Sequence, residues 1–427
     1  MWGRLARALA IAAALVAAPA AHAQAPGADY CEGDGGPAGM ATDAEHTVLA
    51  GDPPLPAGVR SSRVVVGGVA TRVQEAGPAD AADAVVFVHG HPGSSRDWDD
   101  LVAANGRFAR TVAFDVSGYG QSDKTARAVQ STDGAARYID DMLSALGIKR
   151  AVLVVHDFGG IWGLEWARLH PDKLTGAVLI NSGVLIDYVP HPLAVVWSTP
   201  GAGEAQMAQT NRQNFRDSLT SANPRLPLAF IERMYDDYDR ATRCAALRYY
   251  RSAGQNLNLG REQADVLRQR SRPALVIWGR QDPYIPPEQA EHQREAFPSA
   301  RIEYFDDASH WSFVEEPDRT RALVTSFLRP RLAVGRARGV AGRRRVRVRV
   351  RADGALPVLK LRLRLFRRRT PGEPARLIGS SALVRSLSGQ RKLSVRTRRG
   401  WRLRRGAYLL RVTALGVPRQ RSRVLVR

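Results

Sequence analysis

The chain has 427 residues, 44% of them hydrophobic, and a formal net charge of +22. Its length suggests two to three domains, and the apolar content is ample for buried cores. Residues 331–427 contain 30 Lys or Arg and 2 acidic residues, a net charge of +28, so residues 1–330 carry the remaining −6. This distribution excludes strong basicity as a property of the whole protein and assigns it to one C-terminal segment.

The first 23 residues predict a secretory signal peptide. Arg4 and Arg7 form a basic segment, residues 8–18 form an apolar one, and residues 21–23 have an A-x-A cleavage pattern. The apolar run is too short to cross a bilayer comfortably, which favours cleavage over a membrane anchor. We therefore expect a secreted or cell-envelope protein with no transmembrane segment after cleavage.

Only two cysteines occur, Cys31 and Cys244. Export permits a disulfide between them, but the sequence leaves open whether they pair or remain separate thiols. No His, Cys or acidic cluster has the spacing of metal ligands, so we predict no metal and no other cofactor.

After a Gly- and Pro-rich tail or linker at residues 24–62, short apolar strands alternate with helices. The pattern predicts an α/β core with a mostly parallel, doubly wound sheet that helices cover on both faces. The alternation stops at residues 184–272, which have helical patterns and many aromatic residues, and we interpret them as a helical cap that shapes the substrate pocket. The core therefore has two parts, residues 63–183 and 273–330. Strands are expected at 63–73 (a hairpin), 84–89, 110–115, 151–155, 176–181, 274–279 and 301–305. Three helices are expected in the core: one at 131–147, one that ends at His170 and one that begins at Pro286.

Residues 331–427 have a different pattern. Val346, Val348 and Val350 alternate with arginines, and three leucines in the segment 360–366 alternate with Lys or Arg. A strict period of two residues indicates strands with one apolar and one cationic face. We predict a small antiparallel, sandwich-like β domain of about 90 residues.

Four segments with reactive or glycine-rich sequences each follow a predicted strand. They are HGHPG at residues 89–93, HDFGG around Asp157, WGRQD ending at Asp282, and DASHWSF containing His310. The carboxyl ends of parallel strands lie at one edge of a sheet, so we expect these segments to form one site. Their order of nucleophile, acid and base is that of α/β-hydrolases.

An aspartate at the nucleophile position indicates attack on an sp³ carbon. A carboxylate is ionised at neutral pH and needs no base, so Asp157 can displace a leaving group and form an alkyl ester. His310, oriented by Asp282, would then activate water to hydrolyse the ester. Backbone N–H groups of His91 and Phe158 would stabilise the oxyanion.

Each of these residues also has a purely structural interpretation. Asp157 could be a helix N-cap, Asp282 could start a turn, and His310 could simply precede a helix. Their combined order after successive strands favours the catalytic interpretation.

These motifs resemble those of the α/β-hydrolase branch that contains epoxide hydrolases and haloalkane dehalogenases. The resemblance covers roughly residues 60–330. The segment 89–92 is similar to the branch's H-G-x-P loop, and residues 156–159 are similar to its H-D-x-G elbow. The W-G-x-x-D that ends at Asp282 and the S-H-W around His310 are similar to its acid and base segments.

Differences within the branch favour an epoxide hydrolase, with a haloalkane dehalogenase as the alternative. The resemblance implies a Trp after the nucleophile and often an Asn in the loop for a dehalogenase, and this chain has Phe158 and His91. Val155 before the elbow is, by contrast, dehalogenase-like. Epoxide hydrolases use two cap tyrosines, and the segment LRYYR implies Tyr250 as one of them.

The second cap tyrosine has no clear counterpart in the sequence. The nearest tyrosine to the expected position is Tyr188, and Trp197 could donate its N–H to a halide or an oxyanion. The neighbouring Tyr249 and Tyr250 could also be ordinary helix-packing residues. The substrate is a small molecule in either case.

The basic segment 331–427 suggests an anionic cell-envelope polymer as a partner, and nucleic acid is not expected outside the cytoplasm. The alternative is compositional, since the whole chain has few lysines and prefers arginine. A different class of function is an envelope-binding protein with a vestigial hydrolase domain, which the complete set Asp157, Asp282 and His310 argues against.

Overall fold

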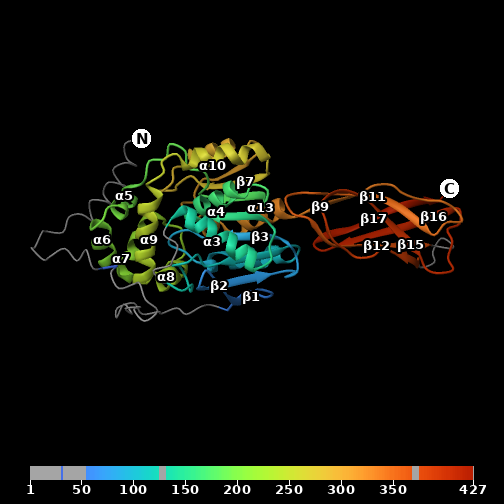
Figure 1. Ribbon diagram of the computed structural model, residues 1–427, viewed down its shortest axis with the longest axis horizontal. Coiled ribbons are helices and arrows are strands. Elements are labelled where there is room, and N and C mark those ends of the chain that lie inside the picture. Colours follow the sequence, from blue (N-terminus) through green and yellow to red (C-terminus); the bar gives the residue numbers. More distant parts are fainter. Residues whose placement is uncertain (1–29, 32–53, 125–130, 368–374, 427) are drawn as a thin grey trace, which may run out of the picture.

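The computed structural model describes residues 30–31, 54–124, 131–367 and 375–426 (Figure 1). The predicted signal peptide, residues 1–23, lies outside the described residues, as does most of the predicted tail, 24–62. Among the helices described, none has the length and apolar character needed to cross a bilayer.

An eight-stranded sheet with the order β1-β2-β4-β3-β5-β6-β7-β8 forms the core of the N-terminal part. The neighbours from β4 to β8 pair in parallel, whereas β1 and β2 form an antiparallel hairpin that joins the sheet through β4. The predicted α/β fold with a mostly parallel sheet is confirmed. The strands are β1 (Arg60–Val66), β2 (Val69–Ala76), β3 (Asp83–Val88), β4 (Arg110–Phe114), β5 (Arg150–His156), β6 (Leu174–Ile180), β7 (Ala274–Gly279) and β8 (Arg301–Phe305).

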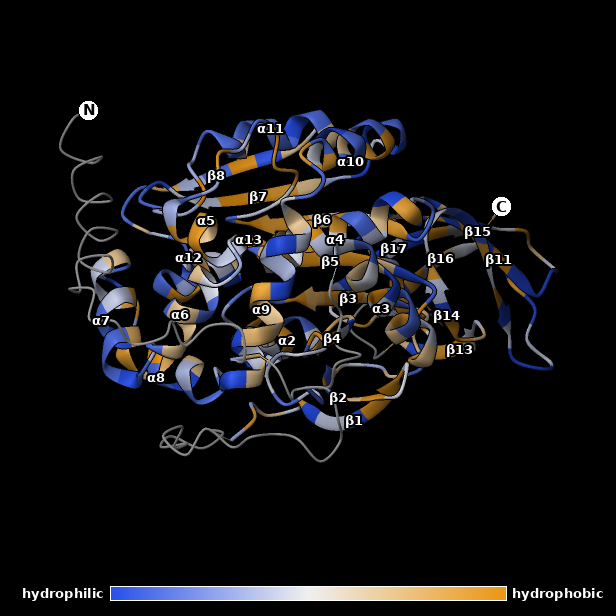
Figure 2. Cartoon of the chain, turned by 60° about the vertical axis from the view of Figure 1, so that its left-hand side comes forward, coloured by the Kyte–Doolittle hydropathy of each residue, from blue (hydrophilic) through white to orange (hydrophobic). Residues whose placement is uncertain are grey.

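Helices cover both faces of this sheet, because its central strands are apolar on both sides (Figure 2). Successive residues of β3 alternate between two cores, so that Val86 packs in one and Phe87 in the other. The first core includes α3 (Thr132–Ala145), α4 (Phe158–Leu169), α10 (Leu259–Leu267) and α11 (Gln289–Ala296). The second includes η1 (Ser95–Trp98), α2 (Asp99–Gly106), α12 (Ser312–Glu315) and α13 (Pro317–Leu328).

Most of the segment between β6 and β7 is helical and lies beside the carboxyl ends of the strands (Figure 1). We predicted all of residues 184–272 as cap, but α10 packs against α4 and α11, because Ala264 and Leu267 belong to the core of the sheet. The short helix η2 (Arg268–Arg270) follows it. The cap helices are α5 (Pro192–Ser198), α6 (Ala202–Ala208), α7 (Arg212–Ala222), α8 (Leu228–Asp236) and α9 (Arg240–Ala253).

Two contacts from distant parts of the chain hold the cap. Cys31 forms a disulfide with Cys244 of α9, which resolves the pairing that the sequence left open. Arg233 of α8 forms a nearly buried ion pair with Asp97, 2.6 Å between Nη2 and Oδ1, next to the loop that follows β3. The cap is thereby fixed both to the N-terminal segment and to the core.

The C-terminal segment forms a β domain, as predicted, but its sheet closes on itself. β10 pairs with β11 on one side and, in parallel, with β17 on the other, so the strands form a barrel where an antiparallel sandwich was expected. Alternating valines and leucines fill its interior. The strands are β9 (Arg331–Val334), β10 (Ala337–Gly339), β11 (Arg345–Asp353), β12 (Val358–Arg367), β13 (Arg376–Ser380), β14 (Val384–Leu387), β15 (Gly389–Thr397), β16 (Gly406–Ala414) and β17 (Val417–Val426).

Candidate active site

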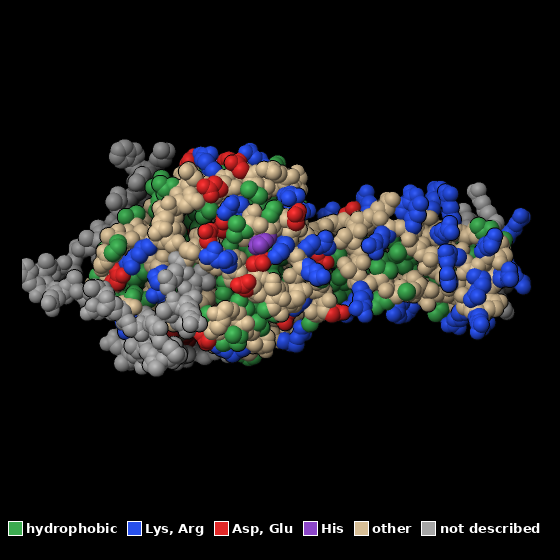
Figure 3. All heavy atoms as spheres, in the orientation of Figure 1, with side chains coloured by type: hydrophobic (Ala, Val, Ile, Leu, Met, Phe, Trp, Pro, Cys, Tyr) green, Lys and Arg blue, Asp and Glu red, His purple; other side chains and the backbone are tan. Residues whose placement is uncertain are grey.

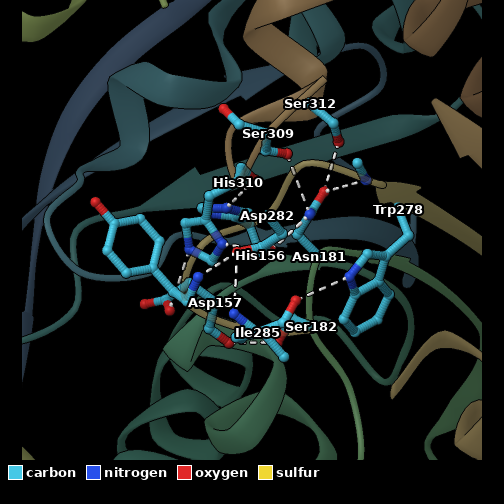
Figure 4. A network of polar contacts seen from close by, with 12 residues as sticks. His156, Asp157, Asn181, Ser182, Trp278, Asp282, Ile285, Ser309, His310 and Ser312 are labelled. Carbon is cyan, nitrogen blue, oxygen red and sulfur yellow. Dashed lines mark hydrogen bonds and ion pairs between the residues drawn. The ribbon is translucent and has the colours of Figure 1, made fainter. Parts of the chain in front are cut away.

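Of the predicted site residues, Asp157, Asp282 and His310 meet at the carboxyl edge of the core sheet (Figure 4). Asp157 follows β5, Asp282 follows β7, His310 follows β8, and the loop containing His91 follows β3. Residues separated by up to about two hundred positions along the chain are therefore brought together by the parallel order of the strands, as expected for this class of sheet.

Asp157 lies on a sharp turn between β5 and α4. Its backbone has a φ of 50° and a ψ of −128°, which a non-glycine residue rarely adopts. The turn also needs Gly159 and Gly160, since a Cβ there would lie 2.2 Å from Val88 O and 1.9 Å from Ser182 Oγ, respectively. The strained turn holds the Asp157 side chain out from the end of the sheet.

The Asp157 carboxylate does not cap α4, although the residue occupies the N-cap position. Instead, Oδ1 accepts a hydrogen bond of 2.7 Å from the backbone N–H of His91. Phe158, the other predicted oxyanion donor, is the first residue of α4, where a backbone N–H has no acceptor within the helix. Both predicted N–H groups are thus beside Asp157.

His310 bridges the two carboxylates. Its Nδ1 donates to Asp282 Oδ2 at 2.8 Å, and its Nε2 lies 3.4 Å from Asp157 Oδ2. Asp282 also accepts, through Oδ1, from the N–H groups of Tyr284 and Ile285. The turn interpretation of Asp282 is therefore correct for one oxygen, while the other oxygen orients His310.

Two residues that sequence reasoning missed hold this arrangement. Asn181, directly after β6, donates from Nδ2 to Asp282 Oδ2 at 2.8 Å, and its Oδ1 accepts from Ser312 Oγ at 2.7 Å. The buried ring of His156 is paired through Nε2 with the carbonyl oxygen of His310 at 3.0 Å. The signal for Asn181 was present, because it too is a polar residue at the end of a predicted strand.

The charges in this cluster depend on one another. Burial would lower the pKa of His310, but Asp282 and Asp157 outweigh it and raise the pKa to about 10. Burial likewise opposes ionisation of Asp157, yet the hydrogen bond and charge of His310 bring its pKa below the usual value. In the free protein Asp157 is therefore a carboxylate beside a protonated His310.

The side chain of His91 is surrounded by aromatic rings. The ring centroid of Tyr238 lies 5.4 Å from that of His91, Trp197 5.5 Å and Tyr250 5.7 Å. Burial lowers the pKa of His91 to about 4, so the imidazole is neutral. The walls next to Asp157 are thus largely apolar, which suits a substrate with hydrocarbon groups.

The ring of Trp197 packs against His91 in the site, but its N–H group is already bonded to another cap residue. Nε1 donates to Gln206 Oε1 within the cap at 2.7 Å. The hydroxyl of Tyr188 likewise donates to the carbonyl oxygen of Tyr284 at 3.1 Å. The expectation that Trp197 could donate to a halide or oxyanion therefore does not hold in this arrangement, and Tyr188 does not supply the second donor.

Tyr249 and Tyr250 face different surroundings. Tyr249 is buried in the core against Trp162, 4.6 Å between ring centroids. Tyr250 packs on Phe158 at 4.8 Å, and burial together with the charge of Asp157 raises its pKa. In the described part of the chain, the Tyr250 hydroxyl has no hydrogen-bond partner, so it is available to a substrate.

A further donor, which the sequence did not indicate, is His191 at the start of α5. Its Nδ1 accepts from the backbone N–H of Ala194 at 3.2 Å, so the proton of the neutral ring is on Nε2. Burial lowers its pKa to about 4, and the charges of Asp157, His310 and Asp282 act on it. His191 is therefore a neutral N–H donor of the cap. Its ring centroid lies 5.2 Å from that of Tyr284, which in turn lies 5.0 Å from that of His310.

Comparison with known proteins agrees with this geometry. Residues 83–317, more than half of the chain, match the family model described as alpha/beta hydrolase fold. The chain belongs to this family. It is a hydrolase of the α/β fold, and the β barrel at residues 331–426 lies outside the matched region.

The hydrolase is similar to proteins of several activities. It is 25% identical over 276 residues to epoxide hydrolase 3 of Xenopus tropicalis, covering 59% of this chain and 73% of that one. It is 27% identical over 282 residues to a cis-3-alkyl-4-alkyloxetan-2-one decarboxylase of Xanthomonas campestris, covering 61% and 93%.

Solved structures show the same fold. The Cif epoxide hydrolase of Acinetobacter nosocomialis has a TM-score of 0.57 and 17% identity over 65% of this hydrolase and 91% of that chain. A haloalkane dehalogenase of Agrobacterium tumefaciens has a TM-score of 0.54 and 23% identity over 63% and 96%.

Proposed function

We propose that the protein is an exported epoxide hydrolase with Asp157 as its nucleophile. A carboxylate oxygen of Asp157 attacks an sp³ ring carbon, the ring C–O bond breaks, and the ring oxygen takes a proton from a cap donor. The product is a hydroxyalkyl ester of Asp157. His310 then takes a proton from water, the hydroxide attacks the ester carbonyl, and the diol leaves as Asp157 is restored.

The contact of His310 with both carboxylates is the observation that carries this proposal. Ester formation removes the charge of Asp157, which is one of the two charges that raise the pKa of His310. The pKa of His310, which is still oriented by Asp282, then falls, so the histidine can release its proton, which restores the cap donor. His310 is therefore neutral when water must be activated. The N–H groups of His91 and Phe158 would stabilise the oxyanion of the second step, which is supported by the hydrogen bond from the His91 N–H to Asp157 Oδ1.

Tyr250 and His191 are proposed as the two donors to the ring oxygen. Both belong to the cap, both are partly buried, and the charge of Asp157 acts on both. Each carries its proton at neutral pH. This pair replaces the two tyrosines that the sequence resemblance implied, with a histidine in the second position.

A haloalkane dehalogenase is the alternative. It needs N–H donors for the departing halide, and the phenyl ring of Phe158 has none. The Trp197 N–H is held by Gln206 at 2.7 Å. These two observations favour an epoxide, whose oxygen must be protonated, over a halide, which leaves as the anion.

Removal of the donors tests the reaction class. Tyr250→Phe combined with His191→Asn is expected to slow epoxide opening by at least about 10²-fold, because general-acid assistance contributes that much. Asn keeps an oxygen to cap α5. Single-turnover rates with an epoxide measure the effect.

Tyr249→Phe is the matched control for this test, because that hydroxyl is buried in the core and has no hydrogen-bond partner among the residues that the structure describes. It should leave the rate unchanged. An equal loss in Tyr249→Phe, or no loss in the double variant, would refute the donor assignment.

Export is a further part of the proposal, supported by the pattern of residues 1–23 and by the Cys31–Cys244 disulfide, which suits an oxidising compartment. Protein recovered outside the cytoplasm of an expressing bacterium should begin at Gln24 when its N-terminus is sequenced. A cytoplasmic protein that retains residues 1–23 would disprove export.

We also propose that residues 331–427 attach the exported enzyme to an anionic polymer of the cell envelope. Their net charge of +28 supports this. The alternative of an envelope-binding protein with a vestigial hydrolase domain is disfavoured, since His310 is hydrogen-bonded to Asp282 and forms an ion pair with Asp157.

A further inference from the structure

One outer face of the barrel, made by β10, β11 and β15, carries seven exposed cationic side chains. We call it the basic face. Lys and Arg side chains gather on the barrel half of the molecule, whereas most Asp and Glu side chains in this view belong to the hydrolase half (Figure 3). The residues of the basic face are Arg338, Arg345, Arg347, Arg349, Arg351, Lys392 and Arg396.

Like charges stand directly opposite one another on this face. Arg338 pairs in register with Arg347, Arg345 with Arg396, and Arg349 with Lys392. Such pairs are destabilising in a sheet. In the described residues of the barrel the only ion pair joins Arg351 and Asp353, so this repulsion has almost no internal compensation. An anionic ligand would supply it.

The spacing of the basic face is set by its strand backbone. Val346, Val348, Val350 and Val395 fill the barrel interior, which fixes the alternate residues outward. Outward residues on one strand are therefore about 7 Å apart, and neighbouring strands are about 5 Å apart. The face is a regular array of cations.

We propose that the basic face binds a linear polyol phosphodiester, a polymer with one phosphate for each three-carbon unit. This inference rests on the proposed attachment of residues 331–427 to an anionic polymer. Such a polymer has six backbone bonds per phosphate, the same number as two residues of a peptide, and an extended repeat is thus about 7 Å long. Phosphates along the polymer then match Arg345, Arg347 and Arg349 along β11.

The residues of the basic face include no aromatic side chain, which favours a polyol phosphodiester over nucleic acid as the ligand. A single nucleic-acid strand has a similar phosphate spacing, but proteins that bind it also stack its bases on aromatic side chains. The described outward residues of β11 and β15 between the cations are Gln390 and Ser394, opposite Arg351 and Arg347. The face thus recognises the charged backbone alone.

The test measures binding of the full-length protein to poly(glycerol phosphate) at a series of salt concentrations. The face variant carries Arg347→Gln, Arg349→Gln and Lys392→Gln. The control variant carries Lys360→Gln, Arg362→Gln and Arg364→Gln, three exposed cations on β12 across the barrel. Both variants lose two arginines and one lysine, so their net charges are equal.

The face variant is expected to reduce the slope of log affinity against log salt by about 2, because three phosphate contacts each contribute about 0.7. The control variant should keep nearly the wild-type slope. Equal reductions of the slope in both variants would overturn the assignment of the basic face as the binding site. They would still be compatible with attachment of residues 331–427 through their overall charge. If the wild type fails to bind at the lowest salt, the proposed attachment fails as well.

Two other polymers test the ligand class. The first is a single-stranded oligonucleotide with a base at every position, and the second is polyglutamate. Each carries the same number of charges as the poly(glycerol phosphate), and each should bind more weakly than it. Tighter binding of the oligonucleotide would replace the polyol assignment with nucleic acid. If polyglutamate binds as tightly as poly(glycerol phosphate), the claim that the basic face recognises the spacing of phosphates is overturned.

Discussion

Asp157→Asn is expected to lower epoxide turnover by at least about 10³-fold, because the amide is a far weaker nucleophile than a carboxylate. The measurement is the rate of diol formation by freshly purified protein over a panel of epoxides. A fall in kcat with little change in the thermal midpoint identifies a loss of chemistry and not of structure.

The fold should tolerate this change. Asn has nearly the same size and shape as Asp, so at the φ of 50° and ψ of −128° of this turn it should add little strain beyond what Asp157 already has. The amide oxygen can still accept from the His91 N–H. Asp140→Asn is the control with the same change in charge, since Asp140 lies on α3, away from the site, and pairs with Lys173 just before β6. Unchanged turnover in Asp157→Asn would exclude Asp157 as the nucleophile.

His310→Gln is expected to stop the reaction after the Asp157 ester has formed and before it is hydrolysed. Attack by Asp157 does not need a base, whereas hydrolysis of the ester does, so the first step should survive and the second should slow by about 10³-fold or more. Rapid-quench experiments should show one equivalent of epoxide consumed per enzyme and then almost none. Steady turnover at the wild-type rate would contradict this role for His310.

The two steps should also differ in their response to pH in the wild type. The pKa of Asp157 is lowered, so alkylation should be nearly constant across the neutral range. In the ester, His310 has lost the charge of Asp157, and its pKa falls from about 10. Ester hydrolysis should then increase with pH as His310 loses its proton, and a hydrolysis rate that falls with pH would oppose this account.

The positions of Asp157, Asp282 and His310 at strand ends followed from the sequence, because strand periodicity and the polar residue after each strand are both local signals. The α/β core was predicted for the same reason. Each strand is a short apolar run, and parallel pairing places all the strand ends at one edge.

Other features depended on contacts that no local pattern encodes. His191 became a candidate donor only once the hydrogen bond from Ala194 showed which ring nitrogen carries the proton. The N–H of Trp197 was available in the sequence and is occupied by Gln206 in the fold. Closure of the C-terminal sheet rests on the three-residue strand β10, which is too short to have a periodicity.

The cap was also harder to delimit than the core. Helix α10 has the same amphipathic character as the cap helices before it, and only its packing against α4 and α11 separates it from them. Sequence patterns locate helices well, but they do not show which other element an apolar helix face packs against, because that depends on the tertiary structure.

The most direct test of the central claim is the intact mass of His310→Gln after exposure to an epoxide and, separately, to the bromoalkane with the same carbon skeleton. We predict a gain equal to the whole epoxide, located in the peptide that contains Asp157, and no gain from the bromoalkane. A gain only from the bromoalkane, equal to its mass without HBr, would make the protein a dehalogenase. An unmodified Asp157 with an epoxide that the wild type hydrolyses would contradict the alkyl-enzyme mechanism itself.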